Sequence, residues 1–298
     1  MKKYLPLLIT ILLMQQNIVA QRLPLLSQIH YAQHLFNPAY VVLKPKAEVY
    51  YMNRSLWLNI PGSPTTNTIT FIVPLKKDIA SLGGYFTTDR ISITKNSSGR
   101  LDFSYKVKEI DSVKIYLGLG GGFTTVNYHY IPSVGVVMNY SRYNAIAGVL
   151  MNWKELNIGI SIPQLFTNTL TLKLPYTKNP DNNYRNIPHI IGTLDYNINL
   201  NNYFNVKTIY TIQKGGKGMP YQFGLNAILR YKNNYWASIG MRTKGNITAG
   251  MGMLLLKRFT FGYGYDLLQT QLNLFGVDVL YGNNHEVIFG YQFGKKSK

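Results

Sequence analysis

The chain has 298 residues with 24 tyrosines, 13 phenylalanines, no cysteine, only 14% charged residues and a formal net charge of +19 at pH 7. The lack of cysteine excludes disulfides, thiolate metal sites and a lipid-modified cysteine. The basic residues are scattered through expected turns and strand ends, which argues against nucleic-acid binding and favours a basic lumen or a surface facing anionic lipopolysaccharide.

Residues 1–20 have the pattern of a secretory signal peptide. Lys2 and Lys3 precede an apolar run at residues 5–14, and small residues lead to an expected cleavage after Ala20. The run is too short to cross a bilayer as a helix, and no later apolar run approaches the ~20 residues that a transmembrane helix needs. Export without cysteine is typical of a bacterial envelope protein.

Residues 21–45 show no clean period and contain Pro24, Pro38 and Pro45. We expect them to form a periplasmic or lumen-filling arm. The Asn37-Pro38-Ala39-Tyr40 segment in this arm is a rigid turn that packs the arm into the lumen or, as an alternative, a contact in which Tyr40 binds a partner.

Residues 46–293 alternate between apolar and polar or small side chains, and the last strand shows the pattern well. Val287, Phe289 and Tyr291 lie on one face, and Glu286 and Gln292 on the other. A soluble sandwich has similar alternation, but the many aromatic residues favour lipid as the solvent of the apolar face. We therefore predict an all-β, single-domain transmembrane antiparallel β-barrel of about fourteen strands, with the arm at its N-terminus. The expected strands are 46–57, 66–75, 79–89, 99–108, 112–126, 143–151, 154–162, 188–200, 203–213, 219–231, 234–243, 246–256, 259–266 and 282–293.

The connections alternate between short and long, as in barrels with short periplasmic turns and long outer loops. The expected long outer connections are 90–98, 127–142, 163–187 and 267–281, and Lys244-Gly245 is a short outer exception. A basic tail at 294–298 follows the last strand. Residues 134–141 also have a strand-like pattern. We interpret them as a hairpin in the outer loop or an extension of the next strand, because a separate strand would make the count odd.

Several short segments, spread over nearly the whole mature chain, together resemble a known family. They are Ser27-Gln28, Phe36-Asn37-Pro38-Ala39-Tyr40, residues 54–64, residues 88–91, Tyr235-Trp236, residues 240–242, residues 263–266 and residues 284–287. In this order and spacing the chain resembles the PorP/SprF family of outer-membrane proteins associated with type IX secretion and gliding motility. The resemblance implies a bacterial outer-membrane location, partnership with type IX secretion components, and a secreted surface protein or adhesin C-terminal domain as client.

We expect any client to meet the long outer loops or the rim. Tyr176, Tyr184 and Arg185 are candidate anchors, since Tyr and Arg favour the centres of interfaces. Trp57, before the turn at residues 60–64, is either an interface aromatic or a binding residue. Further candidates are lumen ion pairs among Arg54, Arg230, Arg242, Asp89 and Asp266, and a hydrogen-bonded rim pair of His285 and Glu286.

Nothing in the sequence predicts catalysis, a cofactor or a metal site. Residues 118–122 are glycine-rich but lack the phosphate-loop pattern. The five histidines form no HExxH motif, and no nucleophile elbow is present. The function we expect is secretion or cell-surface attachment of a client, and the alternative is a transport barrel for small or hydrophobic solutes.

Overall fold

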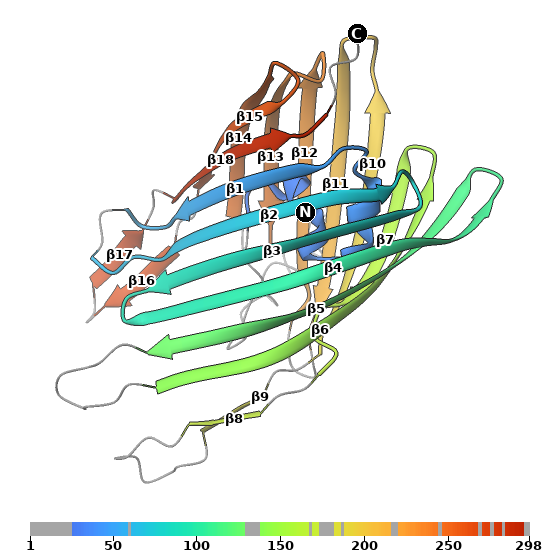
Figure 1. The fold of residues 1–298 in the computed structure, drawn as a ribbon. Helices are drawn as coiled ribbons and strands as arrows, with labels where there is room; N and C mark the ends of the chain where they lie inside the picture. Colours follow the sequence, from blue (N-terminus) through green and yellow to red (C-terminus); the bar gives the residue numbers. More distant parts are fainter. Residues whose placement is uncertain are drawn as a thin grey trace, which may run out of the picture.

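The computed structural model describes residues 26–58, 61–128, 138–166, 169–172, 182–185, 188–215, 220–243, 246–267, 270–274, 277–281 and 284–294. Fourteen strands in these ranges form one closed antiparallel barrel (Figure 1). Pairing of the first strand with the last closes the wall, with Glu48 opposite Gln292 and Ser55 opposite His285. The predicted fold class and strand number are confirmed.

The prediction of a long outer connection at residues 90–98 is wrong, because the strand after it begins at Thr94 and leaves a tight turn with a positive φ at Ser92. The barrel strands otherwise follow the predicted ranges, except that those expected from 99 and from 143 each begin five residues earlier. They are β1 (Glu48–Ser55), β2 (Thr65–Lys76), β3 (Ala80–Ile91), β4 (Thr94–Ile110), β5 (Val113–Tyr128), β6 (Met138–Trp153), β7 (Leu156–Ile162), β10 (Ile190–Asn199), β11 (Phe204–Lys214), β12 (Gln222–Tyr231), β13 (Tyr235–Arg242), β14 (Asn246–Leu255), β15 (Phe259–Leu267) and β18 (Asn284–Gln292). Because β6 starts at Met138, residues 138–141 extend a barrel strand, which was one of the two interpretations of that segment; residues 134–137 lie outside the described residues.

Two short hairpins lie in the long connections and were not predicted. One consists of β8 (Thr169–Leu172) and β9 (Asn182–Arg185), and the other of β16 (Thr270–Leu274) and β17 (Val277–Tyr281). Both lie at the end of the barrel opposite the C-terminus (Figure 1). That end carries the long connections, so it is the outer end.

The connections at the other end are all short, and most have the backbone that tight hairpins need. Positive φ angles occur at Asp78, Asp111, Lys154, Lys232 and Lys257, each between two barrel strands. Such angles match the twist of two-residue hairpin connections. We assign this end to the periplasm.

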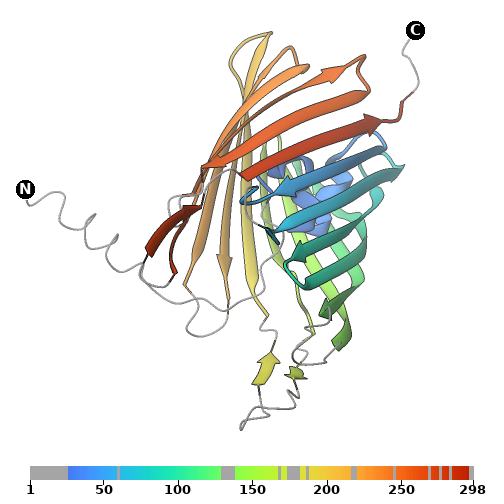
Figure 2. The same cartoon turned by 90° about the vertical axis from the view of Figure 1, so that its left-hand side faces the viewer.

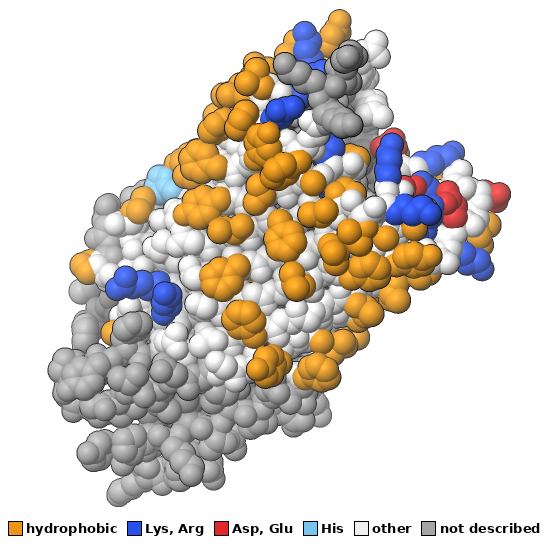
Figure 3. Space-filling view, in the orientation of Figure 1, with side chains coloured by type: hydrophobic (Ala, Val, Ile, Leu, Met, Phe, Trp, Pro, Cys, Tyr) orange, Lys and Arg blue, Asp and Glu red, His pale blue; other side chains and the backbone are white. Residues whose placement is uncertain are grey.

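The wall is apolar outside and polar inside. Exposed residues include Leu101, Ile239 and Met251 at 61–66% exposure, whereas Asp102 and Glu286 are only 1% exposed. Figure 3 shows the apolar side chains as a broad field over the wall, with most charged side chains towards its ends. This inverted arrangement is the one expected when lipid surrounds the strands.

The lumen contains the chain's own N-terminal segment. Residues 26–43, which we call the plug, form the short 3-10 helices η1 (Ile29–Tyr31), η2 (Gln33–Leu35) and η3 (Pro38–Leu43). Figure 2 shows the plug, in blue, enclosed by the strands. None of the helices in the described residues has the length and apolar character needed to cross a membrane.

Candidate functional site

The front of the plug is held by carboxylates of the last strands. The backbone N–H groups of Ser27 and Gln28 donate to Glu286 Oε2 and Oε1 at 2.7 and 3.0 Å. The Ser27 hydroxyl donates to Asp266, and Asp266 also pairs with Arg54. Each hydrogen bond to a charged group stabilises by about 1.5–3 kcal/mol, so these contacts fix the front of the plug firmly.

The middle of the plug is held by Arg100 on β4. Its Nη2 donates to the carbonyl oxygen of His34 at 2.6 Å, and its Nη1 to that of Leu35 at 3.3 Å. Asp102 accepts from Arg100 Nε at 2.6 Å, which balances the buried charge. A paired arginine therefore satisfies two carbonyl groups that 3-10 helices leave free.

The back of the plug is held mainly by an amide and by close backbone packing. Asn37 Nδ2 donates to the carbonyl oxygens of Val149 and Ile160 at 3.1 and 3.4 Å, while its Oδ1 accepts from Ala39 N at 3.0 Å and caps η3. A Cβ on Gly118 would lie 2.2 Å from Ala39 N, and one on Gly148 would lie 2.2 Å from Asn37 Oδ1. Only glycine lets the wall approach so closely.

Apolar contacts complete the seat of the plug. The front packs Leu26, Ala32 and Leu35 against Tyr50, Met52, Tyr85 and Ile288. The back packs Ala39, Tyr40 and Val42 against Tyr116 and Leu150. A third cluster joins Ile29 to Ile209, Ile228 and Trp236. Buried apolar side chains of the plug thus pack against the wall in three separate clusters.

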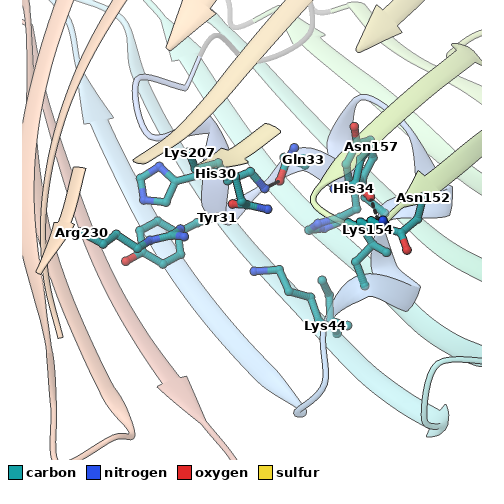
Figure 4. Close-up of a pocket in the computed structure, with 14 residues that line it drawn as sticks. His30, Tyr31, Gln33, His34, Lys44, Asn152, Lys154, Asn157, Lys207 and Arg230 are labelled. Atoms are coloured by element: carbon teal, nitrogen blue, oxygen red, sulfur yellow. Dashed lines mark hydrogen bonds between the residues drawn. The ribbon is translucent and has the colours of Figure 1, made fainter. Parts of the chain in front are cut away.

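A cavity of about 320 Å³ remains between the plug and the wall near the periplasmic end (Figure 4). We call it the basic cavity. Among the residues that the structure describes, no acidic side chain lines it, and it reaches the surface at the exposed turn residue Lys154. Its lining includes four cations from four different parts of the chain: Lys44, Lys154, Lys207 and Arg230.

The pKa of His30 reflects the positive charges around the basic cavity. Burial lowers the pKa of its imidazole well below the usual value, and the charges of Arg230, Lys44 and Lys207 lower it further. Its ring also packs edge-on against Trp236, with ring centroids 4.9 Å apart. His30 is therefore neutral at pH 7, and three cations act on one buried ring.

The comparison with protein families decides the identity. The family model described as "Type IX secretion system membrane protein PorP/SprF" matches residues 18–291. The chain belongs to the PorP/SprF family. PorP/SprF membership together with the closed barrel establishes the bacterial outer membrane as its location. No sequence among the curated proteins matches this PorP/SprF chain.

Solved structures share the fold of the PorP/SprF chain at low sequence identity. The CymD monoaromatic hydrocarbon channel is 12% identical, with a TM-score of 0.54 over 93% of this chain and 95% of that one. The TodX deltaS2S3 mutant monoaromatic hydrocarbon channel is 9% identical, with a TM-score of 0.52 over 88% and 94%. At this identity the likeness extends to the outer-membrane barrel fold alone.

Two of the five predicted binding residues have described side chains. Tyr40 is 3% exposed, lies in η3 and donates its hydroxyl to Thr193 Oγ1 at 3.0 Å, so it packs the plug against the wall. Trp57 follows β1 with a φ of 52°, and its backbone N–H donates to Asn284 Oδ1 at 3.1 Å. The structure therefore separates these two residues, one inside the lumen and one at the outer rim.

The other three predicted binding residues belong to the connection between β7 and β10. Tyr184 and Arg185 lie in β9, paired with Leu170 and Thr169 of β8. Tyr176 lies outside the described residues, as do the expected signal peptide and residues 295–298 of the basic tail. The binding role of these residues stays a prediction.

The charged lumen residues differ in part from their prediction. The Arg54–Asp266 ion pair is confirmed. The predicted His285–Glu286 rim pair is wrong, because adjacent strand residues point to opposite faces: Glu286 binds the plug, and His285 contacts Tyr263 on the outside. The sequence reasoning also missed the Arg100–Asp102 pair, although their spacing of two residues placed both on one strand face.

The residues that hold the plug and line the basic cavity offer hydrogen bonds and charged groups. Within the described ranges no three His, Asp or Glu residues gather in a way that could hold a metal ion. The described site therefore consists of a plug held by hydrogen bonds and ion pairs, next to a basic cavity, in a member of a family of secretion membrane proteins.

Proposed function

We propose that this protein is a plugged outer-membrane component of the type IX secretion system that supports the secretion or cell-surface attachment of a secreted client. The client is expected to be an adhesin-like surface protein, and its C-terminal domain is the expected point of contact. The observation that carries the proposal is the family membership of a barrel whose lumen is filled by its own N-terminal segment.

A plug held in this way supports a role other than free diffusion of solutes. Its polar anchors include Glu286, Asp266, Arg100 and Asn37, which contact it at the front, the middle and the back. Removing the plug breaks all of these contacts at once. The closed wall serves as a rigid support, and the outer connections are the surface available for recognition.

The proposed contact surface is the outer end, where the β8–β9 and β16–β17 hairpins extend from the wall. Tyr176, Tyr184 and Arg185 are the proposed anchors for the client. Type IX components are the proposed partners at the periplasmic end, and lipopolysaccharide is the proposed neighbour of the outer rim.

The test is to delete the gene for this chain from its native cell. The secreted and surface-bound proteins of the deletion strain are then compared with those of the parent strain. We expect a defined set of surface proteins to disappear from the cell surface and to return with the full chain. A variant lacking residues 173–181 should fold and insert but fail to restore display. Normal display in the deletion strain overturns the proposal.

Single-channel recording separates this role from the transport alternative. The purified chain in a planar bilayer should show no lasting open state. Steady conductance, or uptake of a small hydrophobic solute into liposomes that contain the chain, favours transport instead.

A further inference from the structure

The basic cavity belongs to two parts of the protein that are not continuous in the chain. The plug supplies His30, and Lys44 follows directly after it. The wall supplies Lys207 from β11 and Arg230 from β12, and the β6–β7 turn supplies Lys154. Figure 4 shows these side chains arranged around one space between the plug and the strands.

Two of the four cations already have acidic partners. Lys44 Nζ lies 2.9 Å from Glu48 Oε1, and Lys207 Nζ lies 3.3 Å from Asp195 Oδ1. The side chains of Arg230 and Lys154 make no hydrogen bond or ion pair with any other part of the chain that the structure describes. About two positive charges around the cavity are therefore left without a counter-charge.

A second observation concerns His30, whose side chain is buried and lines the cavity. Its exposure is 4%, and its Nε2 atom has no hydrogen-bond partner among the described residues. A buried polar atom without a partner costs about 1–3 kcal/mol. The basic cavity thus contains an unsatisfied neutral imidazole as well as uncompensated charge.

We propose that the basic cavity binds a small ligand that carries two oxyanion groups, either carboxylates or phosphates. A guanidinium such as that of Arg230 binds both kinds of oxyanion in a forked geometry, and Lys154 adds a mobile charge at the entrance. The volume lies at the low end of the range for ligand pockets, which suits a small molecule or two acidic side chains.

Occupancy also has a mechanical effect. Because the ligand contacts both the plug and the wall, it binds the seated plug better than a displaced one. Binding therefore stabilises the seated plug by mass action. The site would let an anionic signal from the periplasm control how firmly the lumen is closed.

Isothermal titration of the full chain in zwitterionic detergent tests the proposal. The probes are pyrophosphate, succinate and a blocked Asp-Asp dipeptide, each with two anionic groups, and a blocked Asn-Asn dipeptide is the neutral control. We expect saturable binding of at least one anionic probe, none of the neutral dipeptide, and about a tenfold or greater loss of affinity in Arg230→Gln. The probe that binds best identifies the source of the two oxyanion groups: a diphosphate, a small dicarboxylate or an acidic peptide segment.

Lys257→Gln is the matched control, because it removes one positive charge from the β14–β15 turn, outside the basic cavity. We expect its affinity to stay within about twofold of the parent. Arg230→Lys keeps the charge and should lose less affinity than Arg230→Gln. Absence of saturable binding by every anionic probe in the parent chain, or equal losses in Lys257→Gln and Arg230→Gln, overturns the proposal.

Discussion

The two ends of the plug are held by different chemistry. At the front, residues 26–28 give their backbone N–H and carbonyl groups to charged side chains: Ser27 and Gln28 donate to Glu286, and the carbonyl oxygen of Leu26 accepts from Arg242. At the back, Asn37 provides a neutral amide, and Gly118 and Gly148 leave the space that the backbone of the plug occupies.

The difference separates two ways of closing a lumen. A charge-based seat depends on protonation and on neighbouring ions, whereas a seat based on shape depends on side-chain volume. The front is therefore the end that can respond to conditions, and the back is the end that sets the position of the plug. Each prediction below tests one side of this distinction.

Two single-cysteine reporters distinguish the ends, since the chain has no cysteine of its own. Ile29→Cys reports on the front, and Val42→Cys reports on the back. Both side chains are at most 6% exposed, and cysteine is smaller than either, so it fits the site. The rate of labelling by a water-soluble thiol reagent then follows the fraction of molecules in which that end is open.

The largest effect is expected from filling the space at the back. In Gly118→Val the new Cβ would meet the backbone of Ala39 at 2.2 Å, which no small shift relieves. Labelling of Val42→Cys should rise about a hundredfold or more, and that of Ile29→Cys much less. The control is Gly121→Val, where a Cβ meets nothing within 4 Å. Equal labelling in the two valine variants would contradict the steric account.

The next effect is expected from removing a charge at the front. Glu286→Gln keeps one acceptor but loses the carboxylate that receives two backbone N–H groups. Labelling of Ile29→Cys should rise about ten- to a hundredfold, with little change at Val42→Cys. His285→Gln changes the neighbouring outward-facing residue and should leave both rates unchanged. A rise at the back alone would break the distinction between the ends.

A smaller effect is expected from the amide at the back. Asn37→Ala removes two donated hydrogen bonds and the cap of η3, at a cost of about 1–2 kcal/mol. Labelling of Val42→Cys should rise about tenfold. Asn37→Asp keeps the acceptor for Ala39 N but not the donors, so comparison of the two variants divides the effect between cap and anchor. No change in either variant would leave shape as the sole support of the back.

The smallest effect is expected from mild acid. Burial lowers the pKa of His34 to about 4; Asp102 and the carbonyl of Gly84 oppose this shift, and Arg100 and Lys44 add to it. Between pH 6.5 and 4 the displaced plug binds more protons than the seated one, so the seated plug loses stability as the pH falls.

Labelling of Ile29→Cys, corrected with a small reference thiol, should therefore rise at least about threefold between pH 7 and pH 6. His34→Gln should reduce the rise without abolishing it, because the pKa of His30 is lowered as well. A corrected rate that does not change with pH would show that neither imidazole gains a proton when the plug opens.

The barrel wall could be predicted because the residues within each strand are enough to show which face is apolar. The alternation of apolar and polar side chains in segments such as residues 259–266 indicates which face of the strand meets lipid. A shift of the strand register by one residue would move every side chain to the opposite face. The hairpins β8–β9 and β16–β17 were missed because strands of four or five residues inside polar connections show too little alternation.

The plug contacts could not be predicted, because they join distant parts of the chain. Residues 21–45 have no period that states where they pack, and Asn37 alone does not reveal that Val149 and Ile160 are its acceptors. The pattern placed Glu286 on the polar face of the last strand but contained nothing about its partners. Tyr40 shows the same limit, since its hydroxyl partner Thr193 lies 153 positions away.

The pairing of Ser27 with Glu286 spans 259 positions and joins the first described residues to the final strand. The acceptor for the front of the plug therefore lies on β18, the strand that closes the barrel against β1. The back of the plug, in contrast, rests mainly on β2 to β6, and Asn37 also reaches β7. The contact of Ser27 with Glu286 can thus form only when the last strand is in place, so it distinguishes a complete barrel from one that lacks β18.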